Sequence, residues 1–130
     1  MNGMGQHRKM GSYKDLLVWQ KGIALVKDIY SASASFPSAE AFGLTSQIRR
    51  AAVSVPSNIA EGNGRASRAE YLHFLNIANG SCNELETQLI IASELGFLDA
   101  MQTHALLQQT NEVGRMLNKL ISRLTAPSEY

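Results

Sequence analysis

The stretch from Leu44 to Leu89 constrains the fold most, because two helical patterns follow each other there with a short turn between them. In each half, apolar residues recur at three- and four-residue steps, as on one face of an α-helix. In the first half they are Leu44, Ile48, Ala51, Val55 and Ile59, and in the second Leu75, Ala78, Cys82, Leu85, Leu89 and Ala92. Gly62–Ser67 supplies the turn, and Ser67 followed by Glu70 is typical of a helix N-cap. The stretch predicts two antiparallel helices.

Helical patterns also precede and follow this pair. The first predicted helix runs from about Lys14 to Ser35 and ends before Pro37, since the residue before a proline disfavours helical geometry. Its predicted apolar face is Leu16, Trp19 or Ile23, Val26 and Tyr30, flanked by Leu17 and Ile29. The last predicted helix begins near Asp99, and its predicted core positions are Met101, Leu106, Val113, Met116 or Leu117, Leu120 and Leu124.

These patterns predict an all-α protein, an antiparallel up-down-up-down four-helix bundle over residues 13–125. Residues 1–12, which include Arg8 and Lys9, show no periodicity and are expected to form a disordered basic tail. Residues 126–130 are expected to form a short C-terminal tail. Gly22, Gly80 and Gly114 fall inside predicted helices, which indicates close approach of neighbouring helices there or at a subunit interface.

Two motifs in the central stretch, SVPSNIAEGNGR and EYLHFLNIANGSCNELETQL, carry a resemblance to a known family. The chain from about Tyr13 to Leu124 resembles bacterial four-helix-bundle proteins named after intervening sequences in large-subunit ribosomal RNA genes. The resemblance implies a homo-oligomeric ring, a pentamer, with no catalytic activity. Some relatives, among them the accessory proteins of diversity-generating retroelements, look like nucleic-acid binders.

Composition is that of an ordinary globular protein with a net charge of +1 and one cysteine. A single cysteine cannot form an internal disulfide, which agrees with the reducing cytoplasm, and Cys82 is expected to be a small core residue. No apolar run reaches the ~20 residues of a membrane span, and the N-terminus lacks the features of a signal peptide. We therefore expect a cytoplasmic protein without membrane contact.

The charges are unevenly distributed, since Ala69–Gly114 contains no lysine or arginine. The bundle topology places one end of each helix together, and the cations expected there are Arg8, Lys9, Lys14, Arg65, Arg68, Arg115, Lys119 and Arg123. The acidic residues expected at the opposite end are Asp28, Glu40, Glu94 and Asp99. In a ring, such basic ends would form one face able to bind phosphate. The alternative is a solvated end with cations near helix C-termini, where the helix dipole favours them.

A polar line runs beside the apolar face of the second predicted helix, through Gln47, Arg50, Ser54, Asn58, Glu61 and Arg65. Arg50 and Glu84 fall at similar heights in an antiparallel pair and are expected to pair. We interpret the group Arg50, Ser54, Asn58, Glu61 and Glu84 as a structural or assembly network, with a binding surface and a ligand pocket as the alternatives.

No catalytic residue, metal ligand or cofactor site is predicted. Glu70 and His73 have the Glu-x-x-His spacing of di-iron bundles, but the required second motif is missing because Met101 precedes His104. Aromatic residues are sparse, so any nucleic-acid contact should be mainly to phosphate. The resulting hypothesis is a non-enzymatic oligomer that binds RNA, DNA or a nucleoprotein through its basic end. The alternative is a protein-interaction scaffold that binds no nucleic acid.

Overall fold

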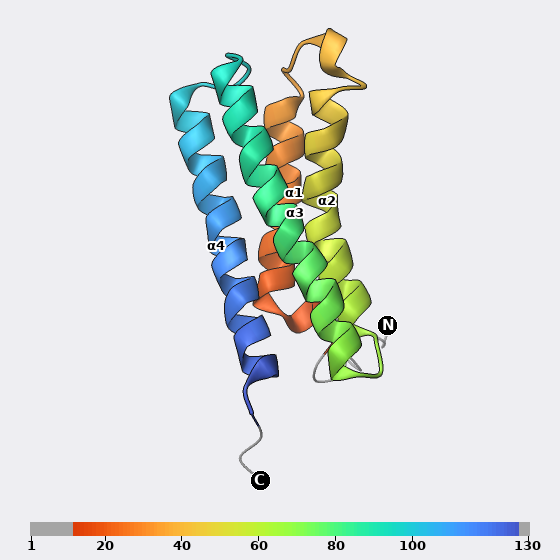
Figure 1. The fold of residues 1–130 in the computed structure, drawn as a ribbon. Helices are drawn as coiled ribbons and strands as arrows, with labels where there is room; N and C mark the ends of the chain where they lie inside the picture. The colour runs from red at the N-terminus through yellow and green to blue at the C-terminus, as the bar shows by residue number, and fades with distance from the viewer. Residues whose placement is uncertain (1–11, 128–130) are drawn as a thin grey trace, which may run out of the picture.

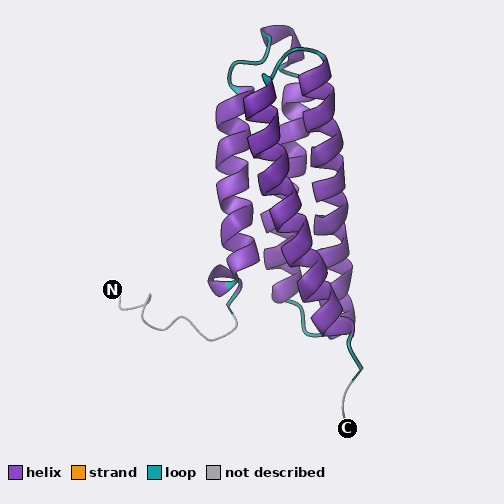
Figure 2. Ribbon diagram, turned by 90° about the vertical axis from the view of Figure 1, so that its left-hand side faces the viewer, coloured by secondary structure: helices purple, strands orange, loops and turns teal. Residues whose placement is uncertain are grey.

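The protein is an antiparallel bundle of four α-helices in a computed structural model that describes residues 12–127 (Figure 1). The helices are α1 (Leu17–Ser33), α2 (Leu44–Asn63), α3 (Arg68–Glu94) and α4 (Ala100–Thr125), with short 3-10 turns η2 (Tyr13–Asp15) and η3 (Ser38–Glu40). A view turned by 90° shows the same four helices side by side, with no strand in the described chain (Figure 2). The predicted all-α bundle is confirmed, whereas ring assembly stays a prediction.

Capping residues set the helix boundaries. The Ser67 hydroxyl accepts a hydrogen bond from the backbone N–H of Glu70 at 3.1 Å, as its motif predicts. Asp99 and Gln102 form a complete capping box at the start of α4. At the start of α1, η2 and the extended backbone of Leu16 delay the helix until Leu17. Most of the two predicted tails, including Arg8 and Lys9, lies outside the described residues.

The core follows the predicted faces of α2 and α3. Every residue predicted for these two apolar faces is buried. On α4 the buried apolar residues are Leu106, Val113 and Leu117, so Leu117 rather than Met116 is the core residue. Met101 is 82% exposed, and its predicted core position is wrong. It lies in the first turn of α4, beside the cap, while Leu98 in the preceding link is buried.

The predicted core face of α1 is right only in part: Leu16, Trp19 and Val26 are partly buried against the core, but they do not form its centre. The buried apolar side chains are Val18, Leu25 and Ile29, about 100° around the helix from the predicted line. Ile23 and Tyr30, predicted to be core residues, are 38% and 43% exposed. The cause is that α1 carries two apolar faces, and the four-helix bundle buries only one of them fully.

Two contacts join α1 to α2 closely. Arg49 on α2 donates hydrogen bonds to the Ser33 hydroxyl at 2.8 Å and to the Tyr30 carbonyl at 3.2 Å, near the end of α1. Farther down, a Cβ added at Gly22 would lie 3.4 Å from the Cβ of Pro56. Gly22 therefore fits the predicted close approach of helices, and α2 continues as a helix through Pro56.

Candidate functional site

The end of the bundle where the described chain begins and ends collects five of the predicted phosphate-binding cations. Here η2, the end of α2, the start of α3 and the end of α4 lie together (Figure 1). We call this region the basic end, and its cations in the described chain are Lys14, Arg65, Arg68, Lys119 and Arg123. Among the described residues, the carboxylates at the same end are Asp15, Glu61 and Glu70. The basic end therefore keeps a positive balance even though the whole chain is nearly neutral.

Local partners divide these cations into two groups. Arg65 forms an ion pair with Glu61 and lies 4.9 Å above the ring of Phe74, so its guanidinium is held in place. The ammonium of Lys14 lies 5.9 Å from the ring of Tyr13. The other three side chains are exposed and have no hydrogen bond or ion pair with any described residue: Arg68, Lys119 and Arg123.

Helix electrostatics separates Arg68 from Arg123. Arg123 lies in the last turn of α4, where the helix dipole stabilises a cation. Arg68 is the first residue of α3, where the same dipole disfavours a cation. Helix stability therefore accounts for Arg123 but gives no reason for an unpaired arginine at position 68.

Arg115 does not lie at the basic end, and its predicted placement is wrong. It precedes the last residue of α4 by ten positions, which corresponds to about 15 Å along the helix axis. The bundle topology correctly places the C-terminal end of α4 at the basic end. Arg115, however, lies well before that end of the helix, near the middle of the bundle. Its side chain joins a different set of neighbours there.

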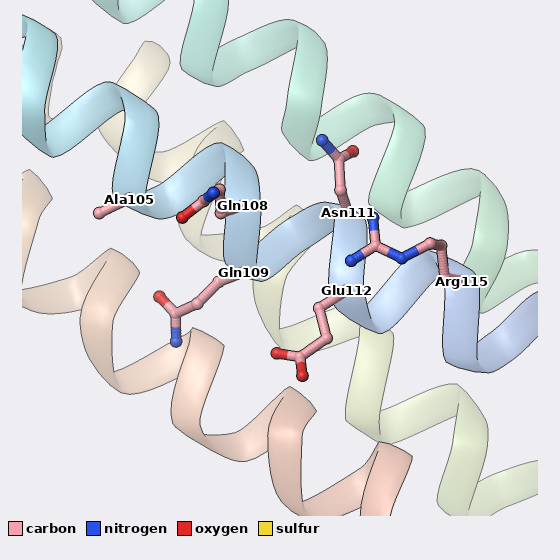
Figure 3. Close-up of a pocket in the computed structure, with 6 residues that line it drawn as sticks. All are labelled: Ala105, Gln108, Gln109, Asn111, Glu112 and Arg115. Carbon is pink, nitrogen blue, oxygen red and sulfur yellow. The ribbon is translucent and has the colours of Figure 1, made fainter.

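These neighbours form the polar outer surface of α4. An open pocket of about 430 Å³ is lined by Ala105, Gln108, Gln109, Asn111, Glu112 and Arg115. In Figure 3 all these side chains come from α4, and the guanidinium of Arg115 folds back toward Asn111 and Glu112. Glu112 instead forms its ion pair with Lys21 of α1, at 3.7 Å. The distribution of charges does not indicate this surface, although Gln108, Asn111 and Arg115 recur at helical spacing.

The opposite end of the bundle is less acidic than expected. Glu40 accepts a hydrogen bond from the backbone N–H of Leu44 at 3.1 Å and so caps α2. Glu94 ends α3, and Asp99 caps α4. However, the predicted acidic residue Asp28 is next to Lys27, which lies at nearly the same height on α1. Helix capping therefore explains Glu40 and Asp99, whereas Glu94 lies at the C-terminal end of α3, where the helix dipole does not favour a carboxylate.

The predicted polar network is divided into separate parts. Ser54 and Ser81 place their hydroxyl oxygens 2.8 Å apart between α2 and α3. The Asn58 amide donates to the carbonyl and the hydroxyl of Ser54, at 2.8 and 2.9 Å. Glu61 does not join this group, because it pairs with Arg65 near the end of α2. Ser54, Asn58 and Ser81 thus form the connected part of the network.

Arg50 and Glu84 do not form the predicted ion pair. Both line a cavity of about 400 Å³, together with Gln47, Ala51 and Ser54. Arg50 donates to the Ser46 hydroxyl at 3.4 Å, and Glu84 accepts from Gln88 at 3.5 Å. The two charged residues lie at similar heights on α2 and α3, as predicted, and line one cavity. Each side chain, however, forms its hydrogen bond with a residue on its own helix.

An apolar surface on α1 and α2 was also missed as a candidate site. Trp19, Ile23 and Val26 of α1 line a groove of about 280 Å³ with Val53 and other residues of α2. Phe42, beside the start of α2, is 99% exposed. The second apolar face of α1 was the signal for this surface, but it was assigned to the core.

The remaining candidates give no catalytic arrangement. Cys82 is buried, and burial raises the pKa of its thiol from 9.0 to about 11, as suits a core residue. Glu70 and His73 are exposed in the first two turns of α3. Within residues 12–127, no cluster of three or more histidine, cysteine, aspartate or glutamate side chains could hold a metal ion. No helix in this region is long and apolar enough to cross a membrane.

Residues 14–119 match the family model described as 23S rRNA-intervening sequence protein. No match was found among curated proteins. A similar solved structure is that of a protein with unknown function from the S23 ribosomal protein family of Bacteroides thetaiotaomicron, with a TM-score of 0.74 and 25% sequence identity. This similarity covers 81% of the present chain and 98% of the other chain. Both comparisons concern the bundle that carries the surfaces described above.

Proposed function

The chain belongs to the 23S rRNA-intervening sequence protein family, as its motifs predict, and from that premise we propose a function for its basic end. The protein is a non-enzymatic, self-assembling bundle that binds the phosphate backbone of RNA or DNA, free or in a nucleoprotein. Phosphate recognition needs exposed cations that are not already neutralised by nearby carboxylates. Arg68, Lys119 and Arg123 meet this requirement.

The position of Arg68 is the observation that carries the proposal. Its charge begins a helix, where the dipole opposes it, and no described carboxylate pairs with it. Neither the helix dipole nor an ion pair with a described residue favours an arginine in this environment. An incoming phosphate would supply the missing partner, and Arg can bind phosphate through two parallel hydrogen bonds.

Assembly would strengthen phosphate binding by bringing several basic ends together. The groove beside Trp19 and Val53 and the exposed Phe42 provide apolar surface that a second copy could bury. Head-to-tail contacts between identical subunits generate a closed ring when the rotation closes. In such a ring, a pentamer by the family resemblance, all basic ends point the same way. The cations of each copy then act on one ligand together.

The second candidate function is a protein-interaction scaffold that binds no nucleic acid. The observation that favours it is the cavity between Arg50 and Glu84, where opposite charges face one opening without pairing. A protein segment that carries both a donor and an acceptor would satisfy both side chains. The two candidates differ in whether nucleic acid binds at all.

The test is fluorescence anisotropy with labelled RNA and labelled duplex DNA over a series of salt concentrations. The wild type is compared with the triple variant Arg68→Glu, Lys119→Glu and Arg123→Glu. Light scattering and circular dichroism verify the mass and helicity of each protein. Binding should weaken with salt, and the variant should lose it, because each phosphate contact contributes about 0.9 to the slope of log K against log salt on duplex DNA.

A matched pair of single variants controls for net charge. Arg68→Glu and Lys27→Glu change the net charge by the same amount at exposed positions. Arg68 lies at the basic end, and Lys27 lies far from it. Arg68→Glu should weaken binding several-fold more than Lys27→Glu. Equal effects would show a response to overall charge, and no binding by the correctly assembled wild type at low salt would refute the proposed function.

A further inference from the structure

The outer face of α4 carries a line of amide and cationic side chains that phosphate binding alone does not explain. His104, Gln108, Asn111, Arg115, Lys119 and Ser122 follow one another at three- and four-residue steps and therefore share one face. We propose that the middle of this line, Gln108, Asn111 and Arg115, which we call the α4 reading face, recognises base edges in the major groove of duplex DNA. The inference rests on the proposed function and adds sequence preference to it.

The side chains of the reading face are available for a ligand. Gln108, Asn111 and Arg115 are exposed, and none has a hydrogen bond or ion pair with a described residue. They come from the middle of one continuous helix of 26 residues. Figure 3 shows Gln108, Asn111 and Arg115 along this outer surface. The backbone therefore holds them in a fixed order, while their polar groups remain free.

The residue types match the donor and acceptor pattern of base pairs. Asparagine and glutamine can form two hydrogen bonds to adenine, and arginine can form two to guanine, all in the major groove. Lys119 and Arg123 follow Arg115 toward the basic end, where they can contact phosphate. Base readers and phosphate contacts thus lie along one helix. This arrangement allows the phosphate contacts to set the register in which the bases are read.

Duplex DNA fits this face better than RNA does. Single-stranded RNA is usually recognised by stacking its bases on several aromatic side chains, and α4 contains no phenylalanine, tyrosine or tryptophan, so that His104 is its one aromatic ring. The major groove of double-stranded RNA is too narrow for side chains to read. The major groove of B-form DNA is about 12 Å wide and admits an α-helix of about 10–12 Å diameter.

The reading face also remains open in an assembly that buries the exposed apolar residues. Ten large hydrophobic residues are exposed in the described chain, and nine of them lie on α1, α2, α3 or the links between helices. On α4 the exposed member is Met101, in the first turn and away from Arg115. Contacts between copies are therefore expected on the other helices, which leaves α4 facing outward.

The experiment is repeated selection from a pool of duplex DNA with a randomised central segment. Three proteins are compared: the wild type, the base-reader variant Gln108→Ala, Asn111→Ala and Arg115→Ala, and the phosphate variant Lys119→Ala and Arg123→Ala. Alanine is favourable on an exposed helix face, so the variants should fold, which melting curves verify. Light scattering confirms that each protein has the mass of the wild type.

The wild type should enrich a motif that it binds about ten-fold more tightly than a scrambled duplex, since one two-hydrogen-bond contact discriminates by about that factor. The base-reader variant should lose this preference and keep its affinity for the scrambled duplex within a few-fold. The phosphate variant should bind both duplexes more weakly and keep the preference. That pattern supports the inference.

Other results overturn the inference in distinguishable ways. Duplex binding without an enriched motif, or a motif retained by the base-reader variant, would refute the reading face and leave the proposed function standing. Binding to RNA alone would likewise refute only the duplex reading. Absence of binding to any nucleic acid would refute both proposals and favour a protein partner.

Discussion

The hydroxyl oxygens of Ser54 and Ser81 lie 2.8 Å apart and join α2 to α3 along a seam that is otherwise mostly apolar. Ser81 is 7% exposed, and Asn58 donates to the Ser54 hydroxyl from the next turn. A partly buried polar contact of this kind can be satisfied only when the two helices keep one register. The serine pair therefore specifies the alignment of α2 and α3, which the apolar residues alone would define less sharply.

Removing these hydroxyls should destabilise the bundle unequally. Ser81→Ala leaves Ser54 bonded to Asn58 and should cost about 1 kcal/mol. Ser54→Ala leaves the buried Ser81 hydroxyl without this partner and should cost about 1–3 kcal/mol. The double variant should cost less than the sum, as measured by urea unfolding. Fully additive costs would mean that the two hydroxyls do not stabilise each other.

Gly62 should not accept a side chain. A Cβ at this position would lie 2.8 Å from the Cβ of Phe74 and 3.0 Å from Cδ1 of Tyr71, where α2 and α3 converge. Gly62→Ala should therefore destabilise the protein by about 1–3 kcal/mol through overpacking. Gly64→Ala is the matched control, because its Cβ would meet only backbone oxygens at 3.7 Å or more. Equal melting temperatures for the two variants would contradict this prediction.

Gly80 and Gly114 should behave in the opposite way. Their predicted close approach to another helix of the same chain is wrong, since an added Cβ would meet no atom within 4 Å. Each substitution by alanine should stabilise the protein by up to about 1 kcal/mol in denaturant unfolding. Light scattering adds a second readout, because a loss of mass with Gly80→Ala alone would place Gly80 at a contact between copies.

Self-assembly should depend on the apolar surface of α1 and α2. Val53 is 38% exposed and lines the groove beside Trp19. Val53→Glu should lower the mass measured by light scattering without loss of helical circular dichroism, because a charge in an apolar interface is costly to desolvate. Met101→Glu, at an 82% exposed site on α4, should leave the mass unchanged. Two variants of identical mass would argue against assembly through this groove.

Cys82 should make stability depend on alkaline pH. Burial raises the pKa of its thiol from 9.0 to about 11, so the folded protein holds the proton more tightly than the unfolded chain does. The resulting stabilisation is fully present below pH 9.0 and is lost as pH rises toward 11. The melting temperature of the wild type should therefore fall more steeply over this range than that of Cys82→Ala. Parallel curves would show that the thiol stays neutral or titrates equally in both states.

The faces of α2 and α3 could be predicted because each helix presents one dominant apolar line. The buried residues from Leu44 to Ile59 and from Leu75 to Ala92 follow these lines. Helix starts at Ser67 and Asp99 were predictable for a similar reason, since capping residues act within a few positions of sequence. Local chemistry alone decides both features.

The failures involve information that local patterns do not contain. α1 has two apolar faces, so periodicity could not decide that Leu25 rather than Ile23 enters the core. Arg50 and Glu84 share a cavity, but side-chain conformation directs each to a residue on its own helix. The reading face on α4 could not be recognised from charge, because Gln108 and Asn111 are neutral and Arg115 is its one charged residue.

The up-down-up-down path brings Ser12 and Pro127, the first and last described residues, to the same end of the bundle as Arg68 (Figure 1). Any tag or domain joined directly at Ser12 or Pro127 would therefore emerge beside the basic end and could shield it from a ligand. In a ring of equally oriented subunits, the same geometry would display every fused cargo on one face, which makes the bundle a scaffold for clustered presentation.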